Sequence, residues 1–180
     1  MPSKKMATES TIELEPLDRA GFVALYGGLY EHSPWIAEQA WLQIADRESV
    51  TQQNLINLLK SIVDNSSYTQ RLELLRAHPE LAGKAAIDGC LTPASNVEQA
   101  SARLDLCSQA EFESFHELNS AYNEKFNFPF ILAVRNKKRA EILSVFKSRL
   151  DNSLDVEFCN AIEQVHKIAS LRLIELSNDG

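Results

Sequence analysis

Residues 108 to 129 read SQAEFESFHELNSAYNEKFNFP, and this stretch decides the fold class. Ser108 and Glu111 have the spacing of a capping box, in which two side chains and two backbone N–H groups bond reciprocally at a helix start. Apolar residues then recur at helical spacing, at Phe112, Phe115, Leu118, Tyr122 and Phe126. The pattern stops at Asn127-Phe128-Pro129, because proline cannot continue a helix. The stretch therefore predicts a long amphipathic helix with a buried face.

The same periodicity extends outward in both directions. It is found in residues 18–28, 35–44, 55–63, 142–150 and 156–176. Ser67 and Gln70 form a second capping box, and that helix is expected to end just before His78-Pro79. Ser95 and Glu98 have the same spacing and predict a further helix start. We therefore expect an all-α fold, a single compact domain of about eight helices with long loops that carry motifs.

Length and composition agree with one globular domain. The chain has 180 residues, of which 44% are hydrophobic and 24% charged, so a wholly disordered or fibrous protein is excluded. We expect a flexible N-terminal tail over residues 1–12 and the helical domain over residues 13–177. The net charge of −7 argues against nucleic acid or an anionic membrane as a partner. A small anionic ligand would need locally placed cations.

The cysteines and the missing motifs narrow the class further. Cys90, Cys107 and Cys159 are odd in number and widely spaced, which predicts neither a disulfide framework nor a zinc site. A reducing, cytoplasmic location fits best. The sequence has no phosphate-binding loop, no dinucleotide-binding glycine run and no metalloprotease or nucleophile-elbow motif. No metal and no cofactor is therefore predicted.

His78 is the first candidate for chemistry. It opens the stretch His-Pro-Glu-Leu-Ala-Gly-Lys, residues 78–84, at the end of a predicted helix. An imidazole titrates near neutral pH, so beside a pocket it can move a proton in either direction. The alternative is a histidine that only caps the last carbonyl groups of the helix.

The second candidate stretch is Ser95-Asn96-Val97-Glu98-Gln99. A capping box explains Ser95 and Glu98 without any ligand. The functional interpretation uses the same geometry, because a helix N-terminus offers donors to an anion. Glu98 and Gln99 could then grip amide or urea groups through paired hydrogen bonds.

The third candidate stretch is the apolar run of residues 130–134, followed by Arg135. Periodicity does not decide whether this run is a strand or a buried helix segment. An arginine after an apolar run is partly desolvated and suits a bidentate grip on a carboxylate. The alternative is an ordinary surface arginine that opens a helix.

Together these stretches resemble the 2-oxo-4-hydroxy-4-carboxy-5-ureidoimidazoline (OHCU) decarboxylase family. The resemblance covers about residues 14–175. It rests on Tyr30-Glu31-His32-Ser33-Pro34-Trp35, the stretch 78–84, Leu91-Thr92 with Ser95-x-x-Glu98-Gln99, Leu118-Asn119-x-x-Tyr122, and Phe126-x-Phe128-Pro129-Phe130 with Arg135.

The resemblance implies a cofactor-independent carboxy-lyase of urate catabolism that forms (S)-allantoin. It assigns catalytic roles to His78, Glu98 and Arg135, with Arg135 on the substrate carboxylate. The substrate-binding residues it implies are Pro79, Ser95, Asn96, Val97, Gln99, Phe130, Ile131, Leu132, Ala133 and Val134. It also implies a homodimer with functional coupling to 5-hydroxyisourate hydrolase.

Two other functional classes stay open at this point. In a non-enzymatic helical interaction module, the three polar stretches are only helix caps and a chain corner. A metal-dependent hydrolase of a purine-derived ureide would need a metal or an activated nucleophile, and the sequence predicts neither.

Overall fold

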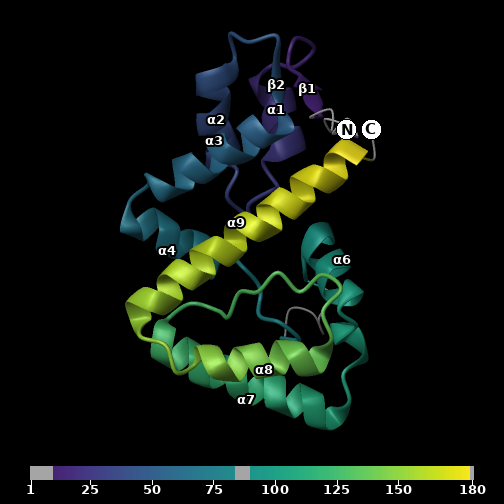
Figure 1. Cartoon of the computed structure of the whole chain (residues 1–180), viewed down its shortest axis with the longest axis vertical. Helices are drawn as coiled ribbons and strands as arrows, with labels where there is room; N and C mark the ends of the chain where they lie inside the picture. Colours follow the sequence, from purple (N-terminus) through teal and green to yellow (C-terminus); the bar gives the residue numbers. More distant parts are fainter. Residues whose placement is uncertain (1–9, 84–89, 179–180) are drawn as a thin grey trace, which may run out of the picture. The chain divides into compact units, whose positions relative to one another are not determined.

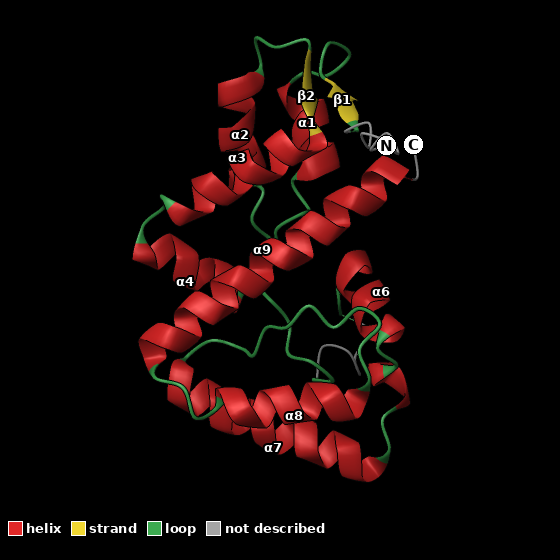
Figure 2. Ribbon diagram, viewed as in Figure 1, coloured by secondary structure: helices red, strands yellow, loops and turns green. Residues whose placement is uncertain are grey.

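The computed structural model describes residues 10–83 and 90–178, and within them the protein is mostly helical (Figures 1 and 2). The predicted all-α class is confirmed, with eight α-helices in the described residues. The chain divides into two compact units, one of residues up to Ser66 together with those from Ala169 onward, and one of Ser67–Ile168. No described helix is both long enough and apolar enough to cross a bilayer.

The first unit holds a small sheet and three complete helices. Strands β1 (Thr11–Glu13) and β2 (Ser49–Thr51) pair antiparallel, with Ile12 opposite Val50. Helices α1 (Arg19–Tyr26), α2 (Trp35–Ile44) and α3 (Gln52–Asp64) pack in sequence order. The C-terminal part of α9 (Leu154–Asn178) belongs to this unit and carries the buried Arg172, whose Nη1 lies 2.9 Å from Glu31 Oε2.

The second unit carries all three candidate stretches. It contains α4 (Tyr68–Arg76), α6 (Pro93–Ser101), a short 3₁₀ helix η1 (Leu104–Leu106), α7 (Gln109–Phe126), α8 (Arg139–Arg149) and the first part of α9. Tyr122 lies fully buried at the centre of its core, in ring contact with Phe126, Phe128, Phe130 and Phe146.

Most of the predicted helix boundaries are confirmed. Ser67 and Ser108 each form the predicted capping box, and α4 ends immediately before the His78-Pro79 corner. Helix α7 ends at Phe126, and its C-cap residue Asn127 has a left-handed backbone with a φ of 62°. The short sheet is an addition to the prediction. Thr11 and Ile12, within the predicted tail 1–12, lie in β1, and residues 1–9 of that tail fall outside the described residues.

Candidate active site

His78 is buried at the C-terminal corner of α4, with 7% of its surface exposed. Its Nδ1 lies 2.9 Å from the carbonyl oxygen of Leu74, in the last turn of the helix. A carbonyl oxygen only accepts hydrogen bonds, so Nδ1 carries the hydrogen and Nε2 is the proton-accepting nitrogen of the neutral ring. The capping contact is therefore present, and it fixes the tautomer that proton transfer through Nε2 needs.

The loop after His78 is held by side chains from two helices. Gln99 on α6 accepts a hydrogen bond from the Ala82 N–H at 3.1 Å and donates to the carbonyl oxygen of Glu80 at 3.2 Å. Asn119 on α7 donates to the carbonyl oxygen of Leu81 at 3.0 Å. The neighbouring Asn123 donates to the Glu80 carboxylate. The two hydrogen bonds of Gln99 therefore connect the second candidate stretch directly to the first. Lys84, which closes the first of them, lies outside the described residues.

The start of α6 differs from the prediction. Thr92 is the N-cap, and its Oγ1 accepts a hydrogen bond from the N–H of Ser95 at 3.3 Å. The predicted capping box of Ser95 and Glu98 is therefore wrong. Pro93 at the first helical position explains the shift, because its fixed φ and missing N–H suit a helix start.

The five residues of the second stretch lie on different faces of α6 and differ in burial. Ser95 and Gln99, one helical turn apart, are buried, Glu98 is half-buried, and Asn96 and Val97 are exposed. Asn96 and Gln99 line a cavity of about 430 Å³ together with Ala82, Leu104 and Phe112. Burial raises the pKa of Cys107 in the wall of that cavity.

The third stretch is neither a strand nor a helix. Residues 130–134 form a buried loop that leads to the half-buried Arg135. Phe130 stacks on Phe146 with ring centroids 3.8 Å apart. Arg149 Nη1 donates to the carbonyl oxygen of Ile131 at 2.7 Å, and Gln164 Oε1 accepts from the Ala133 N–H at 3.1 Å. Helices α8 and α9 therefore fix the backbone to which the family resemblance assigns substrate binding.

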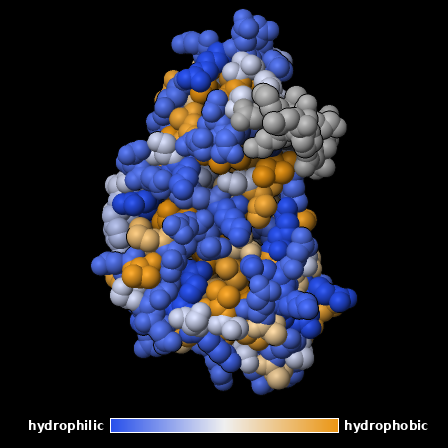
Figure 3. All heavy atoms as spheres, in the orientation of Figure 1, coloured by the Kyte–Doolittle hydropathy of each residue, from blue (hydrophilic) through white to orange (hydrophobic). Residues whose placement is uncertain are grey.

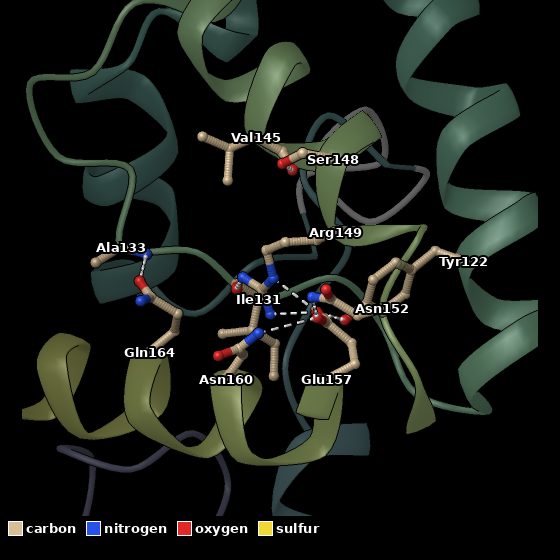
Figure 4. Close-up of polar contacts among 10 residues, drawn as sticks. All are labelled: Tyr122, Ile131, Ala133, Val145, Ser148, Arg149, Asn152, Glu157, Asn160 and Gln164. Carbon is tan, nitrogen blue, oxygen red and sulfur yellow. Dashed lines mark hydrogen bonds and ion pairs between the residues drawn. The ribbon is translucent and has the colours of Figure 1, made fainter. Parts of the chain in front are cut away.

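A buried polar network around Glu157 supports this loop, and sequence reasoning missed it (Figure 4). Glu157 is fully buried and ion-paired with Arg149, whose Nε donates to Glu157 Oε1 at 2.7 Å. Asn152 donates to the second carboxylate oxygen at 2.7 Å, and the Tyr122 hydroxyl donates to the first. Burial, together with its hydrogen bond to the Glu157 carboxylate, raises the pKa of Tyr122 well above its usual range. Within residues 10–83 and 90–178, no three His, Cys, Asp or Glu side chains gather as metal ligands would.

Comparison with known proteins decides the family. The family model described as OHCU decarboxylase matches residues 15–174. The chain belongs to this family. An OHCU decarboxylase of Haloferax volcanii is 40% identical over 163 residues, which cover 91% of this chain and 93% of that protein. The OHCU decarboxylase of Mus musculus is 32% identical over 165 residues, covering 92% and 91% of the two chains.

The fold of this protein is similar to that of two solved crystal structures. One is of (S)-allantoin synthase, with a TM-score of 0.71 and 36% identity over 91% of this chain. The match covers 52% of that longer chain, so this protein spans about half its length. The other is of an OHCU decarboxylase in the presence of (S)-allantoin, with a TM-score of 0.64 and 28% identity over 80% of this chain and 91% of the other.

Proposed function

We propose that this protein decarboxylates 2-oxo-4-hydroxy-4-carboxy-5-ureidoimidazoline to (S)-allantoin in urate catabolism. The observation that carries the proposal is the family match over residues 15–174. The relative from Haloferax volcanii bears the name of this decarboxylase, and one similar crystal structure was determined in the presence of (S)-allantoin.

The substrate itself supplies the electron sink, so we propose that the reaction needs no cofactor. One ring carbon carries both a hydroxyl and a carboxylate. The neighbouring ring carbon carries the ureido group and forms a C=N double bond with a ring nitrogen. When CO₂ leaves, the released electron pair forms a double bond between the two carbons, and the π electrons of the C=N bond move to the nitrogen, which takes a proton. The hydroxyl then loses its proton as the ureido-bearing carbon gains one. Delivery of this proton to one face of the ureido-bearing carbon determines its S configuration.

His78 and Glu98 handle the hydroxyl proton in this proposal. The contact of Nδ1 with Leu74 supports the role of His78, because it makes Nε2 the basic nitrogen of a ring with a fixed orientation. Glu98 lies half-buried next to Gln99, on the helix that holds the loop beyond His78. An imidazole and a carboxylate that reach the same substrate are a suitable pair for general acid–base work.

Arg135 orients the substrate carboxylate, and Gln99 holds a ureido group. Half-burial after an apolar loop supports Arg135, because partial desolvation strengthens a charged hydrogen bond. The bonds of Gln99 to Glu80 and Ala82 use one of its two N–H groups and one of its two acceptor positions. A ureido group can therefore share this amide without displacing the loop.

We further propose a cytoplasmic homodimer that works with 5-hydroxyisourate hydrolase. The odd, widely spaced cysteines support a reducing location. Exposed apolar side chains support self-association, among them Leu25 at 51% and Leu42 at 65% exposure in the first unit. Small apolar patches interrupt the otherwise hydrophilic face drawn in Figure 3.

The test is to add the protein to freshly formed urate-oxidation product, with the hydrolase present, and to follow the circular dichroism of allantoin. The proposal predicts a signal of one hand that appears faster than the spontaneous background. A racemic product at the background rate contradicts it. A parallel reaction with a strong chelator separates this activity from a metal-dependent hydrolase, which the chelator would inhibit.

A further inference from the structure

Two side chains bind the main chain on either side of Leu132. Arg149 on α8 donates to the carbonyl oxygen of Ile131, and Gln164 on α9 accepts from the N–H of Ala133. Both residues are drawn in Figure 4, with the loop running between them. Leu132 is itself buried. The two contacts therefore fix the direction of the peptide groups before and after Leu132, where little solvent reaches.

Each contact fixes a peptide group whose other end belongs to Leu132. The described chain contains no cis peptide bond, and in a trans peptide the C=O and the N–H point in opposite directions. Because the Ile131 carbonyl points to Arg149, the N–H of Leu132 points away from Arg149. Because the Ala133 N–H points to Gln164, the carbonyl of Leu132 points away from Gln164. Leu132 therefore presents one donor and one acceptor away from the side chains that hold it.

The guanidinium of Arg149 is itself held rigidly. Glu157 pairs with it through Nε, and the guanidinium carbon lies 4.7 Å from the centroid of the Phe130 ring. Asn152 and Tyr122 bond the Glu157 carboxylate from other directions. A planar guanidinium meets the Glu157 and Ile131 oxygens at the same time, which an ammonium point charge cannot reproduce in the same geometry.

We propose that Arg149 and Gln164 are positioning residues that aim the N–H and C=O of Leu132 at an amide or ureide group of the ligand. The inference rests on the proposed function and on the substrate-binding role that the family resemblance implies for residues 130–134. A ureido group or ring amide carries an N–H beside a C=O, which complements the donor and acceptor of one residue. The side chains of Arg149 and Gln164 act through the backbone and do not touch the ligand.

Gln164 is the better position for a test. Removing Arg149 would leave the Glu157 carboxylate buried without its counter-charge, and such variants often fail to fold. Gln164 is half-buried, so Gln164→Ala removes the acceptor for Ala133 at small cost to the core. Gln164→Glu keeps an acceptor oxygen and is the conservative variant. Glu163→Ala truncates the exposed neighbour on the same helix and is the matched control.

Two readouts are needed, one of binding and one of turnover. In ¹⁵N-labelled full-length protein, titration with (S)-allantoin is expected to shift the amide signal of Leu132. Gln164→Ala is expected to weaken allantoin binding and raise KM about tenfold, with kcat changed much less. Gln164→Glu is expected to restore KM, and Glu163→Ala to leave it unchanged.

The outcomes separate this inference from the proposed function. If the wild-type protein is active but allantoin leaves the Leu132 signal in place, the inference is wrong and the proposed function stands. The inference is also wrong if Gln164→Ala lowers only the Tm and leaves KM unchanged. If allantoin shifts Leu132 in a Gln164-dependent way but the wild-type protein has no decarboxylase activity, the positioning role stands and the proposed function fails.

Discussion

The side chain of Gln99 holds the main chain of Ala82, four residues beyond His78. Ala82 has a φ of 48°, in the left-handed region that is costly for a residue with a Cβ. The side-chain oxygen of Gln99 accepts a hydrogen bond from the N–H of this strained residue. Gln99 is itself buried, with 5% of its surface exposed. Gln99 therefore stabilises the loop that follows the candidate catalytic histidine, whatever else it binds.

Gln99→Leu is expected to destabilise the protein by about 1–3 kcal/mol, because the buried Ala82 N–H and Glu80 carbonyl lose their partner. Turnover is expected to fall with it, since the loop beyond His78 loosens. Urea denaturation and steady-state kinetics measure the two effects. Gln43→Leu, at an exposed position on α2, is the control. Equal stability of Gln99→Leu and Gln43→Leu would show that the loop does not depend on Gln99.

Arg135→Gln is expected to raise KM by about 10- to 100-fold, because a charged hydrogen bond contributes roughly 1.5–3 kcal/mol to binding. Its effect on the free energy of unfolding is expected to be small, since the side chain is half-buried. Steady-state kinetics over a range of substrate concentrations measures KM.

Arg172→Lys is the comparison for Arg135, because Arg172 is a buried arginine already paired with Glu31 in the first unit. The account predicts that its main effect is on stability. If instead Arg135→Gln leaves KM unchanged while a folded Arg172→Lys raises it, the carboxylate role belongs to Arg172.

Thr92→Ala is expected to destabilise the protein by about 1 kcal/mol, because Thr92 is the N-cap of α6. Thr92→Ser keeps the hydroxyl and is expected to lose less than half of that. The free energy of unfolding in urea distinguishes the two variants. Equal losses in both would mean that the hydroxyl bond to Ser95 contributes nothing.

The ionisation of Glu111 makes part of the free energy of unfolding depend on pH. Its hydrogen bond with Arg139, at 2.9 Å, is the main cause that lowers the pKa of this carboxyl, and the Ser108 N–H contributes. The folded-state pKa therefore lies below that of the unfolded chain. The resulting stabilisation is complete above the unfolded pKa of about 4.3 and is lost as the pH falls through the lowered value.

Glu111→Gln is therefore expected to flatten the decline of Tm between about pH 5 and pH 3. Thermal unfolding over that range measures the slope. Glu117→Gln, at an exposed position on the same helix, is expected to leave it unchanged. A slope as steep in Glu111→Gln as in the wild-type protein would refute the assignment.

Local signals made most of the helices predictable. The capping boxes at Ser67 and Ser108 and the stop before Pro79 depend only on neighbours in sequence, and the structure has all three. The start of α6 was harder, because Thr92 and Ser95 both qualify as caps and Pro93 decides between them. The strands β1 and β2 are three residues each, and helices α1 and α2 separate them in the sequence. No local pattern therefore predicts these strands or their pairing.

The candidate site was less predictable than the fold. The sequence identifies His78 and Gln99 as residues of interest, but the bond from Gln99 to Ala82 depends on the packing of α6 against a distant loop. The pairing of Arg149 with Glu157 depends likewise on how α8 meets α9. A signal existed for Glu157, because it shares a helical stripe with the buried Ala161 and Val165. A carboxylate on an apolar stripe predicts a buried partner but does not name it.

The most direct measurement is the stereochemistry of the allantoin formed by His78→Asn beside the wild-type protein, followed by circular dichroism. The asparagine amide can keep the contact with Leu74 but cannot act as a base near neutral pH. His116→Asn, at an exposed position on α7, is the control and is expected to behave as wild type. The account predicts a racemic product at the spontaneous rate from folded His78→Asn. An excess of (S)-allantoin at the wild-type rate from that variant would contradict it.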